Sequence, residues 1–184
     1  MIEQIKEWDH ELFLWLNNMG HPELDGFMVF LSAKLVWIPL YLGLIFMLYR
    51  HHGNQFWKPL LFLIAAVTIA AQITSSFMKP FFERLRPCKD PQFEGLMTLV
   101  GKCGGRFGFA SSHAANTFAL SIFFVSLTRI KWYYLLVLWS ALVAYSRIHL
   151  GVHFPADIIV GASIGAILGW SSAWACKKWA LHTT

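Results

Sequence analysis

Charged side chains are scarce in this chain. Only 14% of its 184 residues are Asp, Glu, Lys or Arg, while 57% are hydrophobic. Soluble domains carry roughly 25% charged residues. This shortage excludes an ordinary soluble domain and favours a bundle of helices embedded in a membrane. The net charge of +5 is spread over short loops and a few polar clusters, which argues against a nucleic-acid-binding protein.

The sequence also lacks internal repeats, low-complexity tracts and a recognisable cleavable signal peptide. The segment Met1–Met19 contains five charged side chains, a pattern that signal sequences do not show. Its apolar residues, among them Trp8, Leu12 and Trp15, recur at helical spacing. We therefore predict an amphipathic helix in the membrane interface, with packing against another face of the protein as the alternative. One domain over residues 1–184 is the simplest expectation.

Five apolar segments follow. A helix needs roughly 20 apolar residues to cross the hydrocarbon core, and fewer where its end opens into a cavity. The segments are Gly26–Tyr49, in which Lys34 is the one charge, Pro59–Met78, His113–Thr128, Trp132–Ile148 and Pro155–Ala175. The sequence thus predicts an all-α integral membrane protein, with five transmembrane helices plus the N-terminal interfacial helix.

The loops differ in charge between the two sides of such a bundle. All ten Asp and Glu fall on one side. The other side carries cations alone, namely Arg50, Lys58, Arg129, Lys131, Lys177 and Lys178. The positive-inside rule places these cations in the cytoplasm, although the acidic side also holds cations. With five spans, the loop Lys79–Phe107 and the turn Arg147–Asp157 both face the exterior.

Three polar clusters meet at that external face: Lys79–Pro87, Ala110–His113 and Ser146–Asp157. Charge beside an apolar membrane segment is costly and normally persists for a functional reason. Hydrolysis of a phosphate ester needs cations for the phosphoryl oxygens, an in-line nucleophile and a proton for the leaving oxygen. Any one of these residues alone would be read as a snorkelling cation, a helix cap or a satisfied polar group. Their joint spacing predicts a phosphate site.

Five residues are candidates for binding the phosphate. Lys79, Arg86 and Arg147 can neutralise its oxygens, since Arg offers a planar fork of donors and Lys a point charge. Ser111 and Ser112 precede the third apolar segment, where Ser is a favoured N-cap. The free N–H groups and the dipole at that helix start form an anion cradle.

Two histidines and a carboxylate complete the predicted site. His113 lies in the first turn of the third span and faces the same anion. His153 precedes Pro155, a favourable first residue for the fifth helix. Asp157 can hydrogen-bond the His153 ring, fix its tautomer and stabilise the imidazolium that forms on attack. His149 has no assigned role, and we expect it to be structural.

The external loop adds two arginines and two cysteines. Arg84 and Arg106 are expected to contact lipid headgroups rather than to take part in catalysis. Cys88 and Cys103 can form a disulfide if the loop faces an oxidising compartment, or else remain as two thiols. A bridge closing a loop of about 15 residues would contribute about 3 kcal/mol and hold the loop over the site.

The three clusters resemble the signature of the type 2 phosphatidic acid phosphatase (PAP2) superfamily, which reads K-x6-R-P, P-S-G-H and S-R-x5-H-x3-D. The first and third parts match fully, within Lys79–Pro87 and Ser146–Asp157. The second part departs, because the segment Ala110–His113 keeps the first Ser and the His but replaces the Pro and the Gly. Ser112 stands in place of that Gly, which narrows the pocket or adds a hydroxyl donor and so bears on substrate preference.

This resemblance implies a membrane lipid phosphatase that requires no metal and no other cofactor. By the mechanism it implies, His153 attacks phosphorus and forms a phosphohistidine, Asp157 orients His153, and His113 protonates the leaving group. Water then hydrolyses the intermediate. The residues implied to hold the phosphoryl oxygens are Lys79, Arg86, Ser111, Ser112 and Arg147.

The predicted function is hydrolysis of a lipid phosphate or diphosphate at the external face of a bacterial inner membrane. Isoprenoid diphosphate and lipid A phosphate are preferred over phosphatidylglycerol phosphate and phosphatidate. The alternatives are lipid-to-lipid phosphotransfer through the same histidine and a non-catalytic lipid-phosphate binder or transporter. Vanadate-dependent haloperoxidases share the motifs, but they are soluble. We expect membrane lipids and no nucleic acid as partners, and the sequence predicts no oligomeric state.

Overall fold

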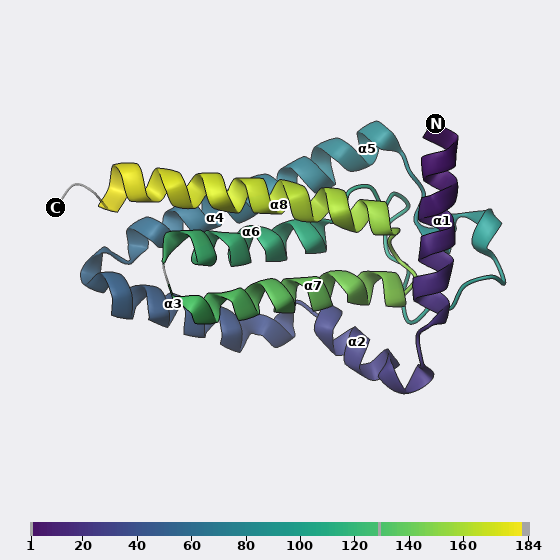
Figure 1. Ribbon diagram of the computed structural model, residues 1–184, viewed down its shortest axis with the longest axis horizontal. Coiled ribbons are helices and arrows are strands. Elements are labelled where there is room, and N and C mark those ends of the chain that lie inside the picture. Colours follow the sequence, from purple (N-terminus) through teal and green to yellow (C-terminus); the bar gives the residue numbers. More distant parts are fainter. Residues whose placement is uncertain (1, 129, 182–184) are drawn as a thin grey trace.

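The computed structural model describes residues 2–128 and 130–181 and is built from helices (Figure 1). Within those residues there is no strand beyond an isolated antiparallel bridge between Leu85 and Phe107. The all-α prediction is therefore confirmed. Arg129, one of the predicted cytoplasmic cations, lies outside the described residues.

The helices of the bundle lie roughly along one long axis, and one helix crosses its end (Figure 1). The α-helices are α1 (Ile2–Asn18), α2 (Asp25–Ser32), α3 (Ile38–His52), α4 (Trp57–Gln72), α5 (Lys79–Phe82), α6 (Ser112–Leu127), α7 (Tyr134–His149) and α8 (Pro155–Ala175). A π-helical segment, Ile73–Met78, joins α4 to α5, and a second, Cys176–Leu181, extends α8.

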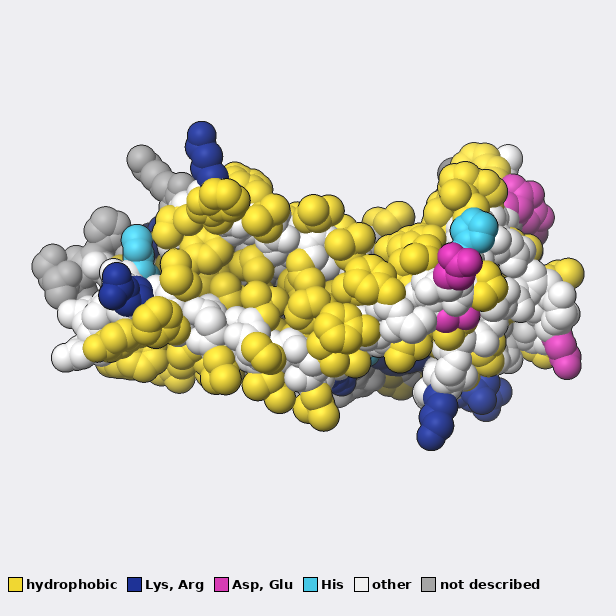
Figure 2. Space-filling view, turned by 90° about the horizontal axis from the view of Figure 1, so that it is seen from below, with side chains coloured by type: hydrophobic (Ala, Val, Ile, Leu, Met, Phe, Trp, Pro, Cys, Tyr) yellow, Lys and Arg dark blue, Asp and Glu magenta, His cyan; other side chains and the backbone are white. Residues whose placement is uncertain are grey.

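The surface and the helix lengths fit an integral membrane protein. Figure 2 shows a hydrophobic belt along one face, with acidic side chains at the α1 end. Two helical stretches, Trp57–Phe82 and Pro155–Leu181, are long and apolar enough to cross a membrane. The bent pair Pro22–Ser32 and Leu35–Gln55 would make a third span, and α6 is a shorter apolar helix. The count of five spans is not confirmed by length and composition, and it stays a prediction.

The first predicted span, Gly26–Tyr49, is not the single helix that its apolar run suggested. The chain axis turns by 65° between its two halves. At Ala33 the backbone is extended, with ψ of 123°, so the helical hydrogen bonding of α2 ends there. Lys34 follows directly at the bend. An ammonium group that turns into the protein at such a break is less costly than one on a lipid-facing surface.

Helices α6 and α8 pack closely through a stripe of small residues that sequence analysis did not single out. Gly161, Gly165 and Gly169 repeat every four residues along α8. A Cβ atom added at any of them would lie 2.1 to 2.4 Å from a backbone oxygen of the segment that begins at Ser111. Small residues allow such close approach between helices in membranes, where association depends on packing. The stripe sets the start of α6 against the start of α8.

Helix α1 lies across the end of the bundle and is amphipathic, as predicted (Figure 1). Trp8 and Trp15 are each 60% exposed, whereas Phe13 is fully buried. Asn17 holds the helix in place, since its side-chain nitrogen donates to the backbone oxygens of Ile148 and His149, at 3.1 and 2.9 Å. The exposed tryptophans suit a membrane interface, and that location stays a prediction.

Candidate active site

Residues from the three sequence clusters come together at the end of the bundle next to α1. Arg86 Nη1 lies 3.0 Å from His153 Nε2, and His153 Nδ1 lies 3.1 Å from Asp157 Oδ2. The backbone nitrogen of Ser111 donates to the backbone oxygen of Asp157 at 2.9 Å. Segments separated by dozens of residues in the chain thus share one site.

The turn after α7 brings His153 back beside Arg147. The backbone oxygen of Arg147 accepts hydrogen bonds from the backbone nitrogens of Val152 and His153, at 3.1 and 3.2 Å. Gly151 permits this turn, because its φ of 74° lies in the left-handed region and a Cβ there would overlap Met97. The turn thereby fixes the spacing between the arginine and the histidine of the third cluster.

The start of α8 places the carboxylate. Pro155 is the first residue of the helix, as predicted, and Asp157 lies in its first turn. Asp157 Oδ2 accepts from the backbone nitrogen of Phe154 at 3.1 Å as well as facing the His153 ring. The carboxylate therefore caps its own helix and orients the histidine at the same time.

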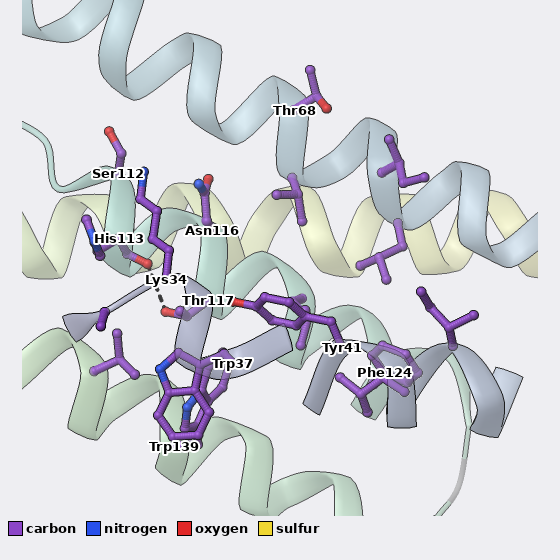
Figure 3. Close-up of a pocket in the computed structure, with 18 of the residues that line it drawn as sticks. Lys34, Trp37, Tyr41, Thr68, Ser112, His113, Asn116, Thr117, Phe124 and Trp139 are labelled. Atoms are coloured by element: carbon purple, nitrogen blue, oxygen red, sulfur yellow. Dashed lines mark hydrogen bonds between the residues drawn. The ribbon is translucent and has the colours of Figure 1, made fainter. Parts of the chain in front are cut away.

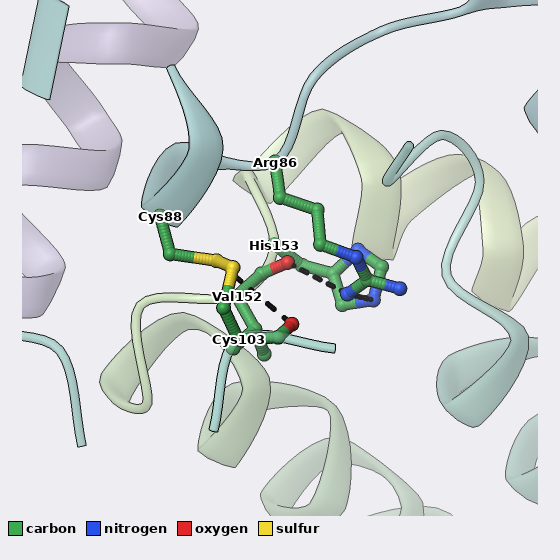
Figure 4. Close-up of a disulfide and its surroundings, with 5 residues drawn as sticks. All are labelled: Arg86, Cys88, Cys103, Val152 and His153. Atoms are coloured by element: carbon green, nitrogen blue, oxygen red, sulfur yellow. Dashed lines mark hydrogen bonds between the residues drawn. A yellow bond between two sulfur atoms is a disulfide. The ribbon is translucent and has the colours of Figure 1, made fainter. Parts of the chain in front are cut away.

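The loop that carries Arg86 is held on both sides. The backbone nitrogen of Arg86 donates to the oxygen of Arg106 at 3.2 Å, which pairs the two arms of the loop. Cys88 and Cys103 form a disulfide in the structure, with Cα atoms 5.9 Å apart. Figure 4 shows this bridge beside Arg86 and His153. The disulfide thus constrains the loop close to Arg86.

Gly108, on the returning arm of the loop, leaves room for the site. A Cβ atom at this position would lie 3.0 Å from Asp157 Oδ2 and 3.2 Å from Arg86 Cγ. A larger side chain would displace one of these two groups. The loop backbone consequently packs directly against the side chains of Asp157, Arg86 and His153.

The environment of His153 keeps its imidazole neutral. The residue is 1% exposed. Burial, followed by the positive charges of Arg86 and Arg147, holds the pKa of His153 well below its usual 6.5. Because Asp157 can only accept, the ring proton lies on Nδ1, and the lone pair on Nε2 faces Arg86 Nη1. A neutral imidazole whose Nε2 lone pair is held only by an arginine donor can act as a nucleophile once that donor turns to a substrate.

Several donors around this histidine have no partner. Within the described parts of the chain, the buried Ser111 Oγ and the Nε atoms of Arg86 and Arg147 make no hydrogen bond. Ser111 occupies the N-cap position of α6, but its hydroxyl makes no capping bond. Buried unpaired polar groups are uncommon and call for an explanation. An oxyanion bound between them would satisfy all three.

Ser112, which stands in place of the glycine of the family motif, contacts the lysine of the first cluster. Lys79 Nζ donates to Ser112 Oγ at 2.9 Å. Thr74 and Ser75, in the π-helical segment, lie 3.0 and 2.8 Å from the same oxygen. The hydroxyl of Ser112 thus adds a polar contact that glycine could not make, and it holds the lysine beside the start of α6.

An apolar cavity of about 430 Å³ opens from the start of α6 and extends between α3, α4, α6 and α7. Ser112 and His113 line its polar end (Figure 3). Lys34 lines it as well, from the bend between α2 and α3, and its amine points toward this polar end in Figure 3. The one charge of the first apolar segment therefore belongs to the surroundings of the site, which sequence analysis did not anticipate. Arg147 Nη1 donates to Ser32, next to the same bend.

Arg84 corrects an expectation, because its guanidinium faces inward. Its Nη1 lies 3.0 Å from Asp157 Oδ1, and its Nη2 lies 2.5 Å from Asp9 Oδ2. The guanidinium carbon is 4.1 Å from the centroid of the Phe154 ring. Two buried carboxylates attract this cation away from the lipid surface. The spacing of the motif identifies Arg86 and not Arg84. Asp9 lies 75 residues from Arg84 in sequence, so no local pattern indicated that these two residues pair.

Two other polar residues that the structure describes at this end of the bundle, His149 and Arg106, have no hydrogen bond with His153 or Asp157. His149 is 2% exposed and its Nε2 lies 2.8 Å from Asp25 Oδ1, an arrangement that fits a structural role. Arg106 is exposed beside the Phe107 ring, and its contact with headgroups stays a prediction. Residues 2–128 and 130–181 contain no group of three or more His, Cys, Asp or Glu that could hold a metal ion.

Comparison with known proteins points to one family. The model of the PAP2 superfamily matches residues 59–181. A lipid A 4'-phosphatase of Bacteroides thetaiotaomicron is 37% identical over 177 residues, covering 92% of this chain and 77% of that protein. A lipid A 4'-phosphatase of Porphyromonas gingivalis is 41% identical over 175 residues, covering 91% and 72%. The crystal structure of Aquifex aeolicus LpxE matches with a TM-score of 0.68 and 30% identity, covering 88% of this chain and 92% of that one.

Proposed function

The chain belongs to the PAP2 superfamily, and we propose that it hydrolyses the phosphate or diphosphate group of a membrane lipid through a phosphohistidine at His153. The observation that carries the proposal is the buried pair of His153 and Asp157, whose Nδ1 and Oδ2 atoms lie 3.1 Å apart. The unprotonated Nε2 of this pair faces Arg86, and Ser111, Arg86 and Arg147 each hold a buried donor without a partner. A non-catalytic lipid binder would not need a neutral, oriented imidazole at the centre of its anion site.

In the first step the lipid phosphate replaces the contacts that the site makes with itself. Arg86 Nη1 leaves the His153 lone pair and donates to a phosphoryl oxygen. Lys79, Arg147 and the start of α6 at Ser111 bind the remaining oxygens, so that charge on the phosphoryl group is neutralised from several sides.

In the second step the Nε2 lone pair of His153 attacks phosphorus, and the bond from phosphorus to the lipid oxygen breaks. Asp157 stabilises the positive charge that develops on the ring. His113, in the first turn of α6, gives a proton to the leaving oxygen and later takes one from water. Attack of that water on phosphorus releases free phosphate and restores the neutral histidine.

The cavity supports a lipid as the substrate. Its polar end holds Ser112 and His113, and its remaining walls are largely apolar side chains of the bundle. A phosphate at the site can therefore stay attached to a chain that lies within the bilayer. We propose a lipid A phosphate as the substrate, because the two curated relatives reported above are lipid A 4'-phosphatases.

An isoprenoid diphosphate is the second candidate, and Lys34 is the observation that favours it. Lys34 and His113 line the same cavity, so the ammonium lies on the leaving-group side of the site. A cation there suits a leaving group that is itself charged, as a lipid monophosphate is. A sugar hydroxyl leaving group would have less need of it.

We further propose that the protein lies in a bacterial inner membrane with its site toward the periplasm. The cation-only loops at the opposite end support this orientation. The disulfide between Cys88 and Cys103 supports it as well, because such bridges persist in oxidising compartments.

The test is release of inorganic phosphate from a panel of lipid phosphates and diphosphates by the purified protein in detergent. The wild type and a His51→Ala variant, which alters an exposed histidine at the far end of α3, should release phosphate. His153→Ala should lose roughly 10³-fold or more in rate while keeping its helical circular dichroism. Full activity of His153→Ala would refute the mechanism, and phosphate that passes only to a second lipid would favour the phosphotransferase.

A further inference from the structure

We propose that Asp9 and Arg84 are positioning residues for His153, acting through Asp157, and that α1 thereby becomes part of the catalytic machinery. The proposal rests on the proposed function, in which His153 is the nucleophile. The four side chains form a continuous row: Asp9 pairs with Arg84, Arg84 pairs with Asp157, and Asp157 faces His153. Asp9 lies outside the three sequence clusters. Arg84 lies within Lys79–Pro87 but is not among the residues predicted to bind the phosphate or to take part in catalysis.

Asp9 makes two contacts that both bear on Asp157. Its Oδ2 lies 2.5 Å from Arg84 Nη2, and its Oδ1 accepts from the backbone nitrogen of Ala156 at 2.8 Å. Ala156 immediately precedes Asp157 in the first turn of α8. Asp9 is only 7% exposed, although it comes from a helix whose opposite face is open. The carboxylate of α1 therefore holds both the cation beside Asp157 and the backbone next to it.

Arg84 is fixed on three sides. Asp9 and Asp157 each bind one of its terminal nitrogens, and the Phe154 ring lies 4.1 Å from its guanidinium carbon. Phe154 in turn packs edge-on against Phe13 of α1, with ring centroids 5.2 Å apart. Such a held guanidinium has little freedom to reach a substrate, which is why we assign it to positioning rather than to phosphate binding.

The charges in this row set how strongly Asp157 acts on His153. With Asp9 present, the two carboxylates and one guanidinium carry a net charge of about −1, so part of the negative charge remains for the imidazolium. Without the Asp9 carboxylate, the whole charge of Arg84 would act on Asp157. The imidazolium that forms on attack would then lose stabilisation. Without Arg84, no guanidinium would offset the charge of Asp157, and the carboxylate would favour the imidazolium more.

Other charged or titratable groups surround the row. Around the row they are Lys6 and His10 of α1 and Glu83, Arg86 and Asp90 of the loop, and around His153 they are Lys79, His113 and Arg147. None of them is altered in the variants below, so each is present in every comparison. If the Asp9 and Arg84 variants shift the titration midpoint of His153 in opposite directions, the shifts can then be assigned to the row.

The closing experiment is an NMR titration of the His153 imidazole in detergent micelles, which needs no turnover. Asp9→Asn keeps the side-chain shape and an oxygen that can accept from Ala156. It should lower the His153 titration midpoint by about one pH unit. Arg84→Gln should raise the midpoint, and Asp9→Glu should return it toward the wild-type value. Glu7→Gln, an exposed change on the same helix, should leave it unchanged.

Steady-state kinetics test whether the row affects the proposed reaction. Asp9→Asn should lower kcat about 10-fold with KM within about 2-fold, since its effect falls on the imidazolium rather than on substrate binding. If Asp9→Asn leaves the His153 midpoint where it is in the wild type, the coupling does not exist, whatever the activity. If the midpoints shift as stated but the wild type releases no phosphate from any lipid, the coupling stands and the proposed function is wrong. Should Arg84→Gln fail to fold, the His153 midpoints of Asp9→Asn and Asp9→Glu are sufficient to test the coupling.

Discussion

At the scale of single residues, the site depends on one imidazole that is buried without being charged. His153 is 1% exposed and has cations on one side and a carboxylate on the other. The carboxylate fixes which nitrogen carries the proton, and the cations keep a second proton away. Orientation and protonation state are thus both set before any substrate arrives.

The lowered pKa of His153 predicts the acid side of the pH profile. Because burial and the nearby arginines depress this pKa below 6.5, the ring stays neutral when the medium reaches pH 6. The acid limb of kcat/KM should therefore lie below pH 6.5. The folding free energy that comes from keeping this ring neutral is fully present above pH 6.5, which is the pKa of the residue in the unfolded chain. It declines as the pH falls toward the lower pKa of the residue in the folded protein. A limb centred at or above pH 6.5 in a phosphate-release assay would contradict this.

Lys34 gives a second prediction at this scale. If its ammonium neutralises a charged leaving group, Lys34→Met should lower kcat/KM for an isoprenoid diphosphate roughly 10-fold more than for a lipid monophosphate. Lys58→Met, which alters a lysine that contacts Gln55 and Ala180 and does not line the cavity, serves as the matched control. Equal losses on the two substrates would remove the support for a diphosphate.

Sequence reasoning identified the residues whose spacing is local, and it missed those whose partners are distant. His153 and Asp157 are four residues apart, so their pairing was predictable. Arg84 was assigned to lipid headgroups because nothing near it in sequence explains it. Its partners are 73 and 75 residues away, in α8 and α1. Long-range ion pairs of this kind have no signature in one sequence.

At the scale of helices, the stripe of glycines on α8 decides where two functional helix ends meet. Gly161 lies against Ser111, so the N-cap residue of α6 touches the helix that carries Asp157. Close packing at this point is a condition for the geometry of the site, because both helix starts contribute to it.

Gly165→Ala tests this packing. The added Cβ would lie 2.1 Å from the backbone oxygen of Ala115, so the helices must separate, at a cost of about 1–3 kcal/mol. The matched control is Gly43→Ala in α3, where nothing lies within 4 Å and alanine should be neutral or stabilising. Thermal unfolding in detergent measures both. A Gly165→Ala protein as stable and as active as the wild type would show that the close contact is dispensable.

Helix starts were easier to predict than helix breaks. Pro155 marked the start of α8, and His113 was correctly placed in the first turn of α6. The bend at Ala33 carries no glycine or proline, and the apolar run continues through it. Only Lys34 interrupted that run, and a single lysine does not distinguish a bend from a snorkelling side chain.

At the scale of the whole molecule, the hydrophobic belt and the unequal charges of the two ends describe a protein oriented in a membrane (Figure 2). The membrane class followed from composition, since apolar residues dominate the chain. The number of spans did not follow as directly, because α6 and α7 have 16 residues each and α2 is tilted against α3. Short helices can end in a polar cavity, so length alone does not count them.

Orientation can be tested by labelling. In intact cells with a permeable outer membrane, a thiol reagent that cannot cross the inner membrane should label Lys102→Cys in the loop that carries Arg86. It should reach Asn54→Cys, between α3 and α4, only after lysis. Both positions are exposed, and the remaining free thiol, Cys176, is buried. Labelling of both positions from the same side, or the reverse pattern, would contradict the proposed topology.

Formation of a phosphohistidine at His153 is the step on which the proposed reaction depends. Wild-type protein mixed with a lipid phosphate, quenched in base within milliseconds and digested should yield a His153 peptide carrying one phosphoryl group that is stable in base and lost in acid. The His153→Ala protein should yield no phosphorylated peptide. Phosphate release by a wild type that carries the phosphoryl group on Ser111, on His113 or on no residue at all would contradict the mechanism.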